Sequence, residues 1–269
     1  MDSRSIVAIK FDALQRYMML RTLSGWLPLF VVTEYPKSGG TWVSQMLSAY
    51  LQLPFPRNRR PPLASCIMHG HIPPLKGMRN VLCIHRDGRD IAVSLYYHSL
   101  FQNEKNSQHL VDRVRKDLNF SDPEDIEFNL PRFLEYVYLR DSSSRSPFRF
   151  SWPRFVEAWN REDAICLKYE ELICDGAECL GAVLEQLLGV EVDSLRVEKV
   201  VEKYSFANQA RRAPGVEINS SFLRKGVPGD WKTKFSNQAA MIFEEIAGST
   251  LVELGYEADS SWVERCGRE

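Results

Sequence analysis

LFVVTEYPKSGGTW, residues 29–42, joins an apolar run to a helical pattern through a loop suited to binding an anion. Residues 29–33 form a continuous apolar, β-branched run, which is typical of a strand buried on both faces of a parallel sheet. In residues 42–51 the apolar side chains recur at helical spacing. Gly39 and Gly40 let the backbone approach an oxyanion closely, and the free N–H groups at a helix start favour negative charge. The stretch therefore predicts a strand–loop–helix cradle for an oxyanion.

The side chains of the loop add to this prediction. Lys37 supplies a cation, and Ser38 and Thr41 supply hydroxyl donors. The loop is not a Walker A motif, because that motif has its lysine directly before the hydroxyl residue and the chain contains no Gly-Lys pair. A Gly-Gly turn beside a surface lysine is the simpler interpretation, and the octapeptide from Tyr35 to Trp42 as a whole disfavours it.

Strand and helix patterns alternate along the rest of the chain. Further apolar runs occur at residues 66–68, 81–84 and 164–167, and further helical patterns occur at residues 91–100 and 179–188. This alternation predicts an α/β fold with a central, mostly parallel sheet flanked by helices. A chain of 269 residues with this pattern is expected to form a single domain, residues 1–269.

Two stretches lack the alternation. Residues 103–149 are polar and charged, with serine-rich loop signals at residues 142–147, and Phe133, Val137 and Tyr138 indicate one helix there. Residues 208–230 are irregular. We interpret the first stretch as an elaboration over the sheet and as part of the wall of an acceptor pocket.

Composition restricts the class of protein. Of the residues, 44% are hydrophobic and 26% are charged, and the net charge of −1 gives no overall attraction to nucleic acid or to an anionic membrane. The six cysteines form no C-x-x-C pair and no Cys/His cluster at zinc spacing. The cysteine usage favours reduced core thiols in a cytoplasmic protein, and the net charge favours the absence of a nucleic-acid partner.

The apolar stretch at residues 18–32 does not read as a membrane span. Arg21 interrupts it, Pro28 breaks it, and it is shorter than the roughly 20 apolar residues that cross a bilayer. It also lacks the order of charged, apolar and small residues of a signal peptide. We expect a short amphipathic helix around residues 11–22, then the buried strand, and no stable membrane insertion.

Two further motifs supply cations. In HRDGRDIAVS, residues 85–94, Arg86 and Ser94 lie eight residues apart across a predicted strand-to-helix corner, where they can converge on one anion. FLRKGVPGDWK, residues 222–232, places two cations before a glycine. Either motif alone is equally consistent with surface ion pairs. With the cradle, they describe a ligand with two separate anionic ends, which is the charge distribution of 3′-phosphoadenosine 5′-phosphosulfate (PAPS).

In this order, the three motifs resemble those of the cytosolic-type PAPS-dependent sulfotransferase family. YPKSGGTW is similar to the family's 5′-phosphosulfate loop, RDGRDIAVS to its 3′-phosphate motif and FLRKGVPGDWK to its C-terminal signature. The resemblance covers roughly residues 29–235. It implies the P-loop nucleotide-kinase-like fold of sulfotransferases, PAPS as co-substrate, PAP as product and a cytoplasmic transferase.

The resemblance also implies roles for individual residues. Lys37 would contact the bridging oxygen of the leaving phosphate. The 5′ phosphate would be held by Ser38, Gly39, Gly40 and Thr41. Adenine would lie against Trp42, Tyr169 and Phe206. The 3′ phosphate would be held by Arg86, Ser94, Arg224, Lys225 and Gly226.

A general base is suggested by MHGHIP, residues 68–73, where the family has a Lys-Thr-His-Leu-Pro run. His71 stands at the position of the family's histidine, and an ordinary imidazole pKa of about 6.5 suits removal of a hydroxyl proton near neutral pH. His69 stands at the position of the lysine, and its role stays open. The implied reaction is in-line displacement at sulfur, for which no metal is required.

Other functions stay open at this point. A P-loop small-molecule kinase would share the cradle, a non-catalytic PAP- or PAPS-binding protein would keep the nucleotide site, and a luminal glycan sulfotransferase would keep the chemistry. The acceptor is expected to be a small molecule with a hydroxyl or an amine. Gly40 replaces the family's usual first threonine. A homodimer stays an open alternative, although residues 233–244 do not match the family's dimer motif. The cluster Arg57, Arg59 and Arg60 either recognises an anionic substrate or is a solvated loop.

Overall fold

A computed structural model gives the fold and describes residues 6–24, 26–57, 59–139, 151–160 and 164–266. The chain divides into two compact units. The sheet unit consists of Met1–His85 and Ala158–Arg212, and the helical unit consists of Arg86–Glu157 and Ala213–Glu269. A single domain across residues 1–269 stays a prediction.

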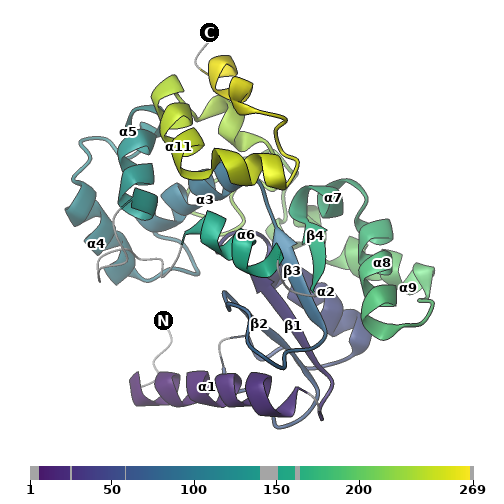
Figure 1. Cartoon of the computed structure of the whole chain (residues 1–269). Helices are drawn as coiled ribbons and strands as arrows, with labels where there is room; N and C mark the ends of the chain where they lie inside the picture. Colours follow the sequence, from purple (N-terminus) through teal and green to yellow (C-terminus); the bar gives the residue numbers. More distant parts are fainter. Residues whose placement is uncertain (1–5, 25, 58, 140–150, 161–163, 267–269) are drawn as a thin grey trace. The chain divides into compact units, whose positions relative to one another are not determined.

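The sheet unit is built on four parallel strands in the order β2-β1-β3-β4 (Figure 1). The strands are β1 (Leu29–Glu34), β2 (Cys66–Gly70), β3 (Val81–His85) and β4 (Ile165–Lys168). Every residue of β1 is buried, as expected for a strand covered on both faces. Thr33 pairs with Gly70, and His85 pairs with Lys168, so the loops after these strands leave from one edge of the sheet. The predicted parallel sheet is confirmed.

Several helices belong to the sheet unit. They are α1 (Ile6–Met18), α2 (Gly40–Leu51), α7 (Tyr169–Cys174), α8 (Gly176–Leu188), α9 (Ser194–Lys203) and α10 (Phe206–Ala210). Met46, Leu184 and Val197 from three of these helices pack with Ile67 and Leu82 of the sheet in one buried cluster. The helices predicted at residues 42–51 and 179–188 are confirmed as α2 and α8. The six cysteines are free thiols, as expected.

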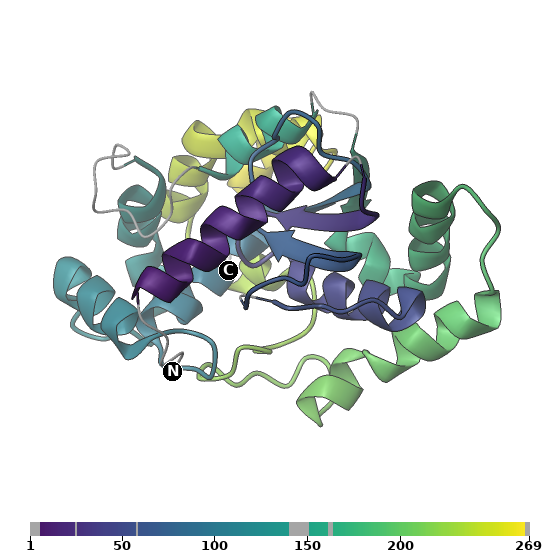
Figure 2. The same ribbon diagram turned by 90° about the horizontal axis from the view of Figure 1, so that it is seen from below.

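Helix α1 begins earlier than the predicted helix at residues 11–22, and it ends at Met18, where a π-helical turn (Met19–Leu23) follows. Seen from below, it crosses in front of the strands (Figure 2). No helix in the described ranges is both long enough and apolar enough to cross a bilayer.

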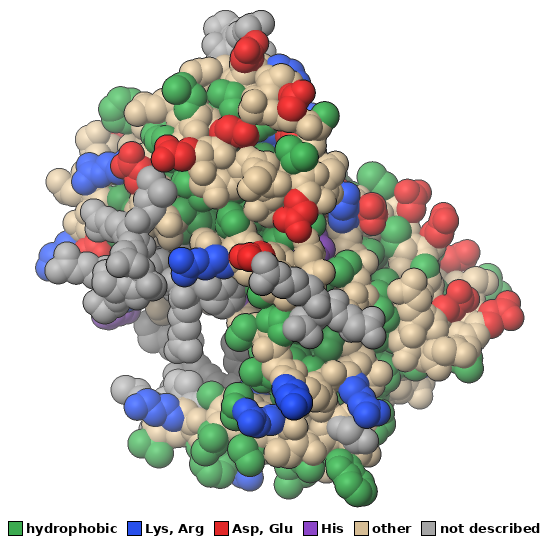
Figure 3. All heavy atoms as spheres, viewed as in Figure 1, with side chains coloured by type: hydrophobic (Ala, Val, Ile, Leu, Met, Phe, Trp, Pro, Cys, Tyr) green, Lys and Arg blue, Asp and Glu red, His purple; other side chains and the backbone are tan. Residues whose placement is uncertain are grey.

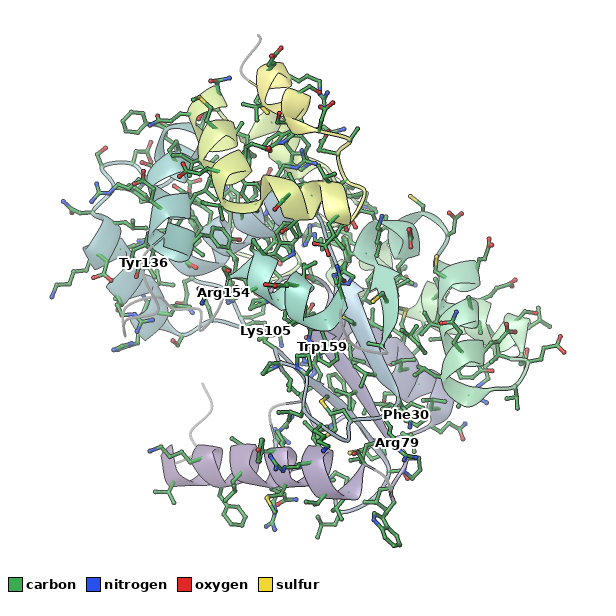
Figure 4. The ribbon with its side chains drawn as sticks, in the orientation of Figure 1. Phe30, Arg79, Lys105, Tyr136, Arg154 and Trp159 are labelled. Carbon is green, nitrogen blue, oxygen red and sulfur yellow. The ribbon has the colours of Figure 1, made fainter. Side chains whose placement is uncertain are left out.

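Side-chain hydrogen bonds hold the backbone just after the end of β2. Trp159, near the end of α6 (Trp152–Asn160), donates its indole N–H to the carbonyl of Ile72 at 3.0 Å (Figure 4). The Thr33 hydroxyl donates to the same carbonyl at 2.9 Å and accepts the Ile72 N–H at 3.3 Å. These bonds fix the backbone on the carboxyl side of His71.

The helical unit contains α3 (Gly88–Leu100), α4 (Gln108–Leu118), α5 (Ile126–Leu134), most of α6 and α11 (Asn237–Glu253). A π-helical turn (Glu135–Leu139) and two 3₁₀ turns (Asp230–Thr233 and Ser260–Arg265) complete it. The helix predicted at residues 91–100 is α3. The helix indicated by Phe133, Val137 and Tyr138 is confirmed as α5 and the π-helical turn that follows it, whereas α4 was not predicted. The loop signals at residues 142–147 lie outside the described residues.

Arg89 lies inside the aromatic core of the helical unit. Its guanidinium is 3.7 Å from the ring centroid of Trp231 and 4.7 Å from that of Trp262. It is paired with Asp87 at 2.8 Å and with Glu257 at 2.5 Å, and its side chain is only 2% exposed. A charge buried this deeply is stable only when it is paired.

Replacing Arg89 by methionine keeps the length of the side chain but removes the buried cation that pairs with Asp87 and that shares Glu257 with Arg265. We expect R89M to lower the free energy of unfolding by about 3–5 kcal/mol, because breaking a buried ion pair leaves an uncompensated charge. Urea denaturation measures this change. The control R113M, at an exposed position of α4, is expected to change the same quantity by less than about 0.5 kcal/mol. Equal effects of the two variants would contradict the prediction.

Candidate active site

The loop between β1 and α2 has the backbone of an anion cradle. Lys37 has φ 77° and Gly39 has φ 97°, both left-handed, before α2 begins at Gly40. A non-glycine residue rarely adopts positive φ, and such residues cluster at functional sites. The Ser38 side chain is completely buried, and its Oγ has no hydrogen-bond partner among the described residues. A buried hydroxyl in this state is suited to binding an oxygen of a ligand.

The buried carboxylate of Glu34, at the end of β1, contacts the cradle and the next strand. Its Oε2 accepts the N–H of Gly40 at 2.5 Å, and its Oε1 lies 3.0 Å from Nε2 of His69. Burial alone raises the pKa of Glu34, but the hydrogen bond and charge of His69, with smaller contributions from His71 and Gly40, hold this pKa below its usual value. The ionised carboxylate therefore ties the first residue of α2 to β2.

His71 follows β2 at the same edge of the sheet. Its Nδ1 lies 3.0 Å from the backbone carbonyl of Glu34, so Nδ1–H donates to this oxygen and Nε2 is left with the lone pair. The ring of His71 lies 5.9 Å from that of His69.

The surroundings of His71 also set its charge. The residue is exposed at the surface, yet enough protein surrounds the ring for burial to lower its pKa. Glu34 opposes this shift, while His69 and Lys37 reinforce it. The result is a neutral imidazole with an available Nε2, which is the state that a general base requires.

Two aromatic rings adjoin the cradle. Tyr169 lies so close to Gly39 that a Cβ added there would come within 2.7 Å of the ring. Trp42 meets the same ring edge-to-face, with 5.9 Å between centroids, and donates its indole N–H to the carbonyl of Tyr204 at 2.7 Å. Phe206 begins α10 two residues later. The structure thus places Trp42 and Tyr169 beside the cradle. The bond from Trp42 to the Tyr204 carbonyl connects the cradle to the segment that leads into Phe206.

The residues of the sheet unit fit a phosphosulfate joined to adenine. The oxyanion could be bound by two hydroxyls, from buried Ser38 and from Thr41 in the first turn of α2, and by the cation of Lys37. Trp42 and Tyr169 offer apolar surface to a base. In the described parts of the chain, no group of three or more His, Cys, Asp or Glu side chains has an arrangement that could hold a metal ion.

In the helical unit, Asp90 joins the other two motifs. Its carboxylate accepts the N–H of Gly229 at 2.7 Å and that of Trp231 at 3.0 Å, and it lies 3.9 Å from Nη2 of Arg86. Ser94 stands one turn further along α3. The motifs at residues 86–94 and 222–232 therefore come together within this unit.

Arg224 and Lys225 share one carboxylate. Both are paired with Asp230, and Arg224 is also paired with Glu217. Burial raises the pKa of Asp230, but the two cations hold it below its usual value. Gly226 follows with φ 71°, so the chain turns directly after the cations. The carboxylate keeps both cations in one place.

Sequence reasoning missed the carboxylates that position the predicted residues. Glu34, Asp90 and Asp230 each stand inside or beside a motif, and each is buried. The signal available for Glu34 is an acidic residue that directly follows an apolar strand. Its partners, at positions 40 and 69, become visible only when the strands are paired.

Residues 67–255 match the sulfotransferase domain family. The chain belongs to the sulfotransferase family. This sulfotransferase is 24% identical to sulfotransferase 1A1 of Bos taurus over 275 residues, which cover 84% of each chain. It is 30% identical to sulfotransferase 1C2 of Homo sapiens over 110 residues, which cover 36% of this chain and 37% of that one.

Solved structures show the same fold. Mouse sulfotransferase SULT7A1, complexed with PAP, superimposes with a TM-score of 0.57 at 17% identity, covering 94% of both chains. Retinol dehydratase, in complex with androsterone and inactive cofactor PAP, superimposes with a TM-score of 0.58 at 16% identity, covering 91% of this chain and 85% of that one. The predicted α/β sulfotransferase fold is confirmed, and the chain is a PAPS-dependent sulfotransferase.

Gly40 leaves the space that Glu34 and His69 fill, because a Cβ added there would lie 2.6 Å from Cδ of Glu34 and 2.7 Å from Nε2 of His69. We expect G40A to lower the free energy of unfolding by about 1–3 kcal/mol, the usual cost of overpacking. The control G181A lies in α8, where the nearest atom to an added Cβ is 4.0 Å away, and it should be neutral or stabilising by up to about 1 kcal/mol. Urea denaturation of both variants measures the difference. A G40A variant as stable as the parent would show that this space is not filled.

Proposed function

We propose that this sulfotransferase moves the sulfuryl group of PAPS to a hydroxyl or amine of a small-molecule acceptor, with His71 as general base and Lys37 at the leaving phosphate. The observation that carries the proposal is the bond from His71 Nδ1 to the carbonyl of Glu34. It joins the base to the strand that leads into the cradle, so base and cradle share one edge of the sheet.

His71 accepts the proton of the acceptor at Nε2, because Nδ1–H is committed to the Glu34 carbonyl. The acceptor oxygen or nitrogen then bonds to sulfur as the bond from sulfur to the bridging oxygen breaks. Lys37 and the N–H groups at the start of α2 stabilise the charge that develops on the departing phosphate of PAP. The sulfuryl group that PAPS loses is thus gained by the acceptor, and the proton that the acceptor loses is gained by His71.

The remaining predicted residues bind the nucleotide in this proposal. Ser38, Gly39, Gly40 and Thr41 hold the 5′ phosphate. Trp42, Tyr169 and Phe206 hold adenine. The 3′ phosphate is held by Arg86, Ser94, Arg224, Lys225 and Gly226. Because these groups come from both units, the proposal requires the two units to act as one sulfotransferase domain.

The acceptor class is best found by experiment. The androsterone complex of retinol dehydratase supports an acceptor of small-molecule size. A screen of phenols, aliphatic alcohols, sugars and amines with sulfur-labelled PAPS tests the proposal directly. Transfer of label to one class with release of PAP is the expected result, and binding of PAP without transfer to any class would contradict an enzymatic role.

The role of His71 predicts the pH dependence. Burial lowers the pKa of His71, so the neutral base persists below the ordinary pKa of 6.5 and is lost only when the pH falls through the lowered value. We expect the acidic limb of the kcat/KM profile to have its midpoint below pH 6.5. Steady-state assays between about pH 4.5 and 8 measure this limb. A midpoint above 6.5 would assign the limb to another group.

Substitution separates the base from the nucleotide site. We expect H71A to lower kcat by about 10²–10⁴-fold with little change in the Kd for PAP, because a general base acts on the acceptor. K37A is expected to lower kcat by about 10²–10³-fold. The matched control H109A, at an exposed position of α4, should keep the parental kcat. Near-parental turnover by H71A would remove His71 from the mechanism.

A further inference from the structure

Helix α1 carries an outward-facing apolar stripe. Val7, Phe11, Leu14 and Met18 follow one another at intervals of four, three and four residues, which places them on one helix face. Their exposed fractions are 76%, 54%, 57% and 48%. The opposite arrangement, with apolar residues inward, is usual for a surface helix of a globular protein.

The rest of the helix is held firmly to the sheet unit. The carboxylate residue Asp12 is buried, and so are Met19 and Leu20 in the π-helical turn. The Ser24 hydroxyl donates to the carbonyl of Gly77 at 2.6 Å. The folded sheet unit therefore holds α1 in an orientation in which Asp12 is buried and Phe11 is exposed.

The segment that surrounds the stripe is strongly basic. Residues 6–81 contain nine lysines and arginines but only two acidic residues, although the whole chain has a net charge of −1. Both acidic residues, Asp12 and Glu34, are buried, at 8% and 4% exposure. The surface formed by this segment is thus cationic.

A basic loop, consisting of Arg57, Arg59 and Arg60, lies directly beside the stripe. The guanidinium of Arg60 lies over the ring of Phe11, 5.3 Å from its centroid. Arg16 of α1 donates to the backbone carbonyls of Arg57 and Arg59. These contacts place exposed cations along the edge of the apolar face.

Figure 3 shows this combination on the surface over α1. The side chains coloured there are hydrophobic or basic, and none of those visible over α1 in this view is acidic. Trp26, which follows the π-helical turn, is 87% exposed. Exposed tryptophan is characteristic of protein surfaces that contact the boundary between lipid and water.

We propose that α1 and the basic loop form a docking surface for an anionic lipid bilayer, with α1 lying in the plane of the interface. An apolar face edged by Lys and Arg is the pattern of such helices, and the charge complements acidic headgroups. A second copy of the chain would oppose one cationic face to another, which electrostatic repulsion disfavours. The proposal concerns peripheral binding and does not depend on the identity of the acceptor.

Sedimentation with vesicles tests the proposal, using the full chain with phosphatidylcholine alone or with about 30% phosphatidylserine added. We expect binding only to the anionic vesicles, weakening as salt rises. The double variant R57Q/R59Q should bind about 25-fold more weakly, since each basic residue near the surface contributes about fivefold. F11S/L14S should bind at least about tenfold more weakly, because less apolar area enters the interface.

Two matched controls lie in the helical unit. F128S removes an aromatic side chain that is 78% exposed on α5, and R113Q removes an exposed cation of α4. Both should bind anionic vesicles like the parent, and all variants should keep the parental melting temperature because every altered side chain is exposed. Three results would overturn the proposal: no binding to anionic vesicles at low salt, undiminished binding by F11S/L14S, or a dimer in analytical ultracentrifugation that F11S/L14S dissociates.

Discussion

Glu34 ends β1 with its carboxylate buried, and the geometry of the sheet unit's site depends on that one side chain. Its two oxygens engage the first N–H of α2, at Gly40, and the imidazole of His69, while its own carbonyl receives Nδ1–H of His71. Glu34 is thus hydrogen-bonded to the cradle, to β2 and to His71, the proposed base. A negative charge so close to an oxyanion site is unfavourable by itself, and the histidines that hold the pKa of Glu34 down offset that cost.

The same contact explains the unusual glycine of the cradle. The family resemblance implies a threonine at the position of Gly40, and the space that a side chain would take there is filled by Glu34 and His69. A hydroxyl is lost from the loop, while the start of α2 gains a buried anchor. Ser38 is buried, its Oγ has no hydrogen-bond partner among the described residues, and it remains as a hydroxyl that can bind a ligand. Positions 34, 40 and 69 are therefore coupled, because a Cβ at position 40 would meet the side chains of both Glu34 and His69.

Local patterns predicted what depends on local physics. The sequence predicted the strand at residues 29–33, the cradle and the helix after it, because a buried strand and a helical period can both be recognised from neighbouring residues. The middle of the chain was foreseen only in part, because one helix was predicted there and α4 was not. In α4 only Val111, Val114 and Leu118 face inward among charged residues, and α5 contains Pro131, which normally argues against a helix. Contacts such as Glu34 to His69 depend on strand pairing, which no local pattern reveals.

Helix α1 shows that periodicity alone does not determine which face of a helix is buried. The sequence predicted an amphipathic helix near residues 11–22, and amphipathicity alone suggests that its apolar side packs inward. The structure instead turns Asp12 inward and leaves Phe11 and Leu14 in solvent. Exposed apolar area of this extent on a fixed helix is costly in water unless another phase covers it. Since the surrounding surface is cationic and its acidic residues are buried, an anionic interface is the phase that satisfies both the apolar and the charged side chains at once.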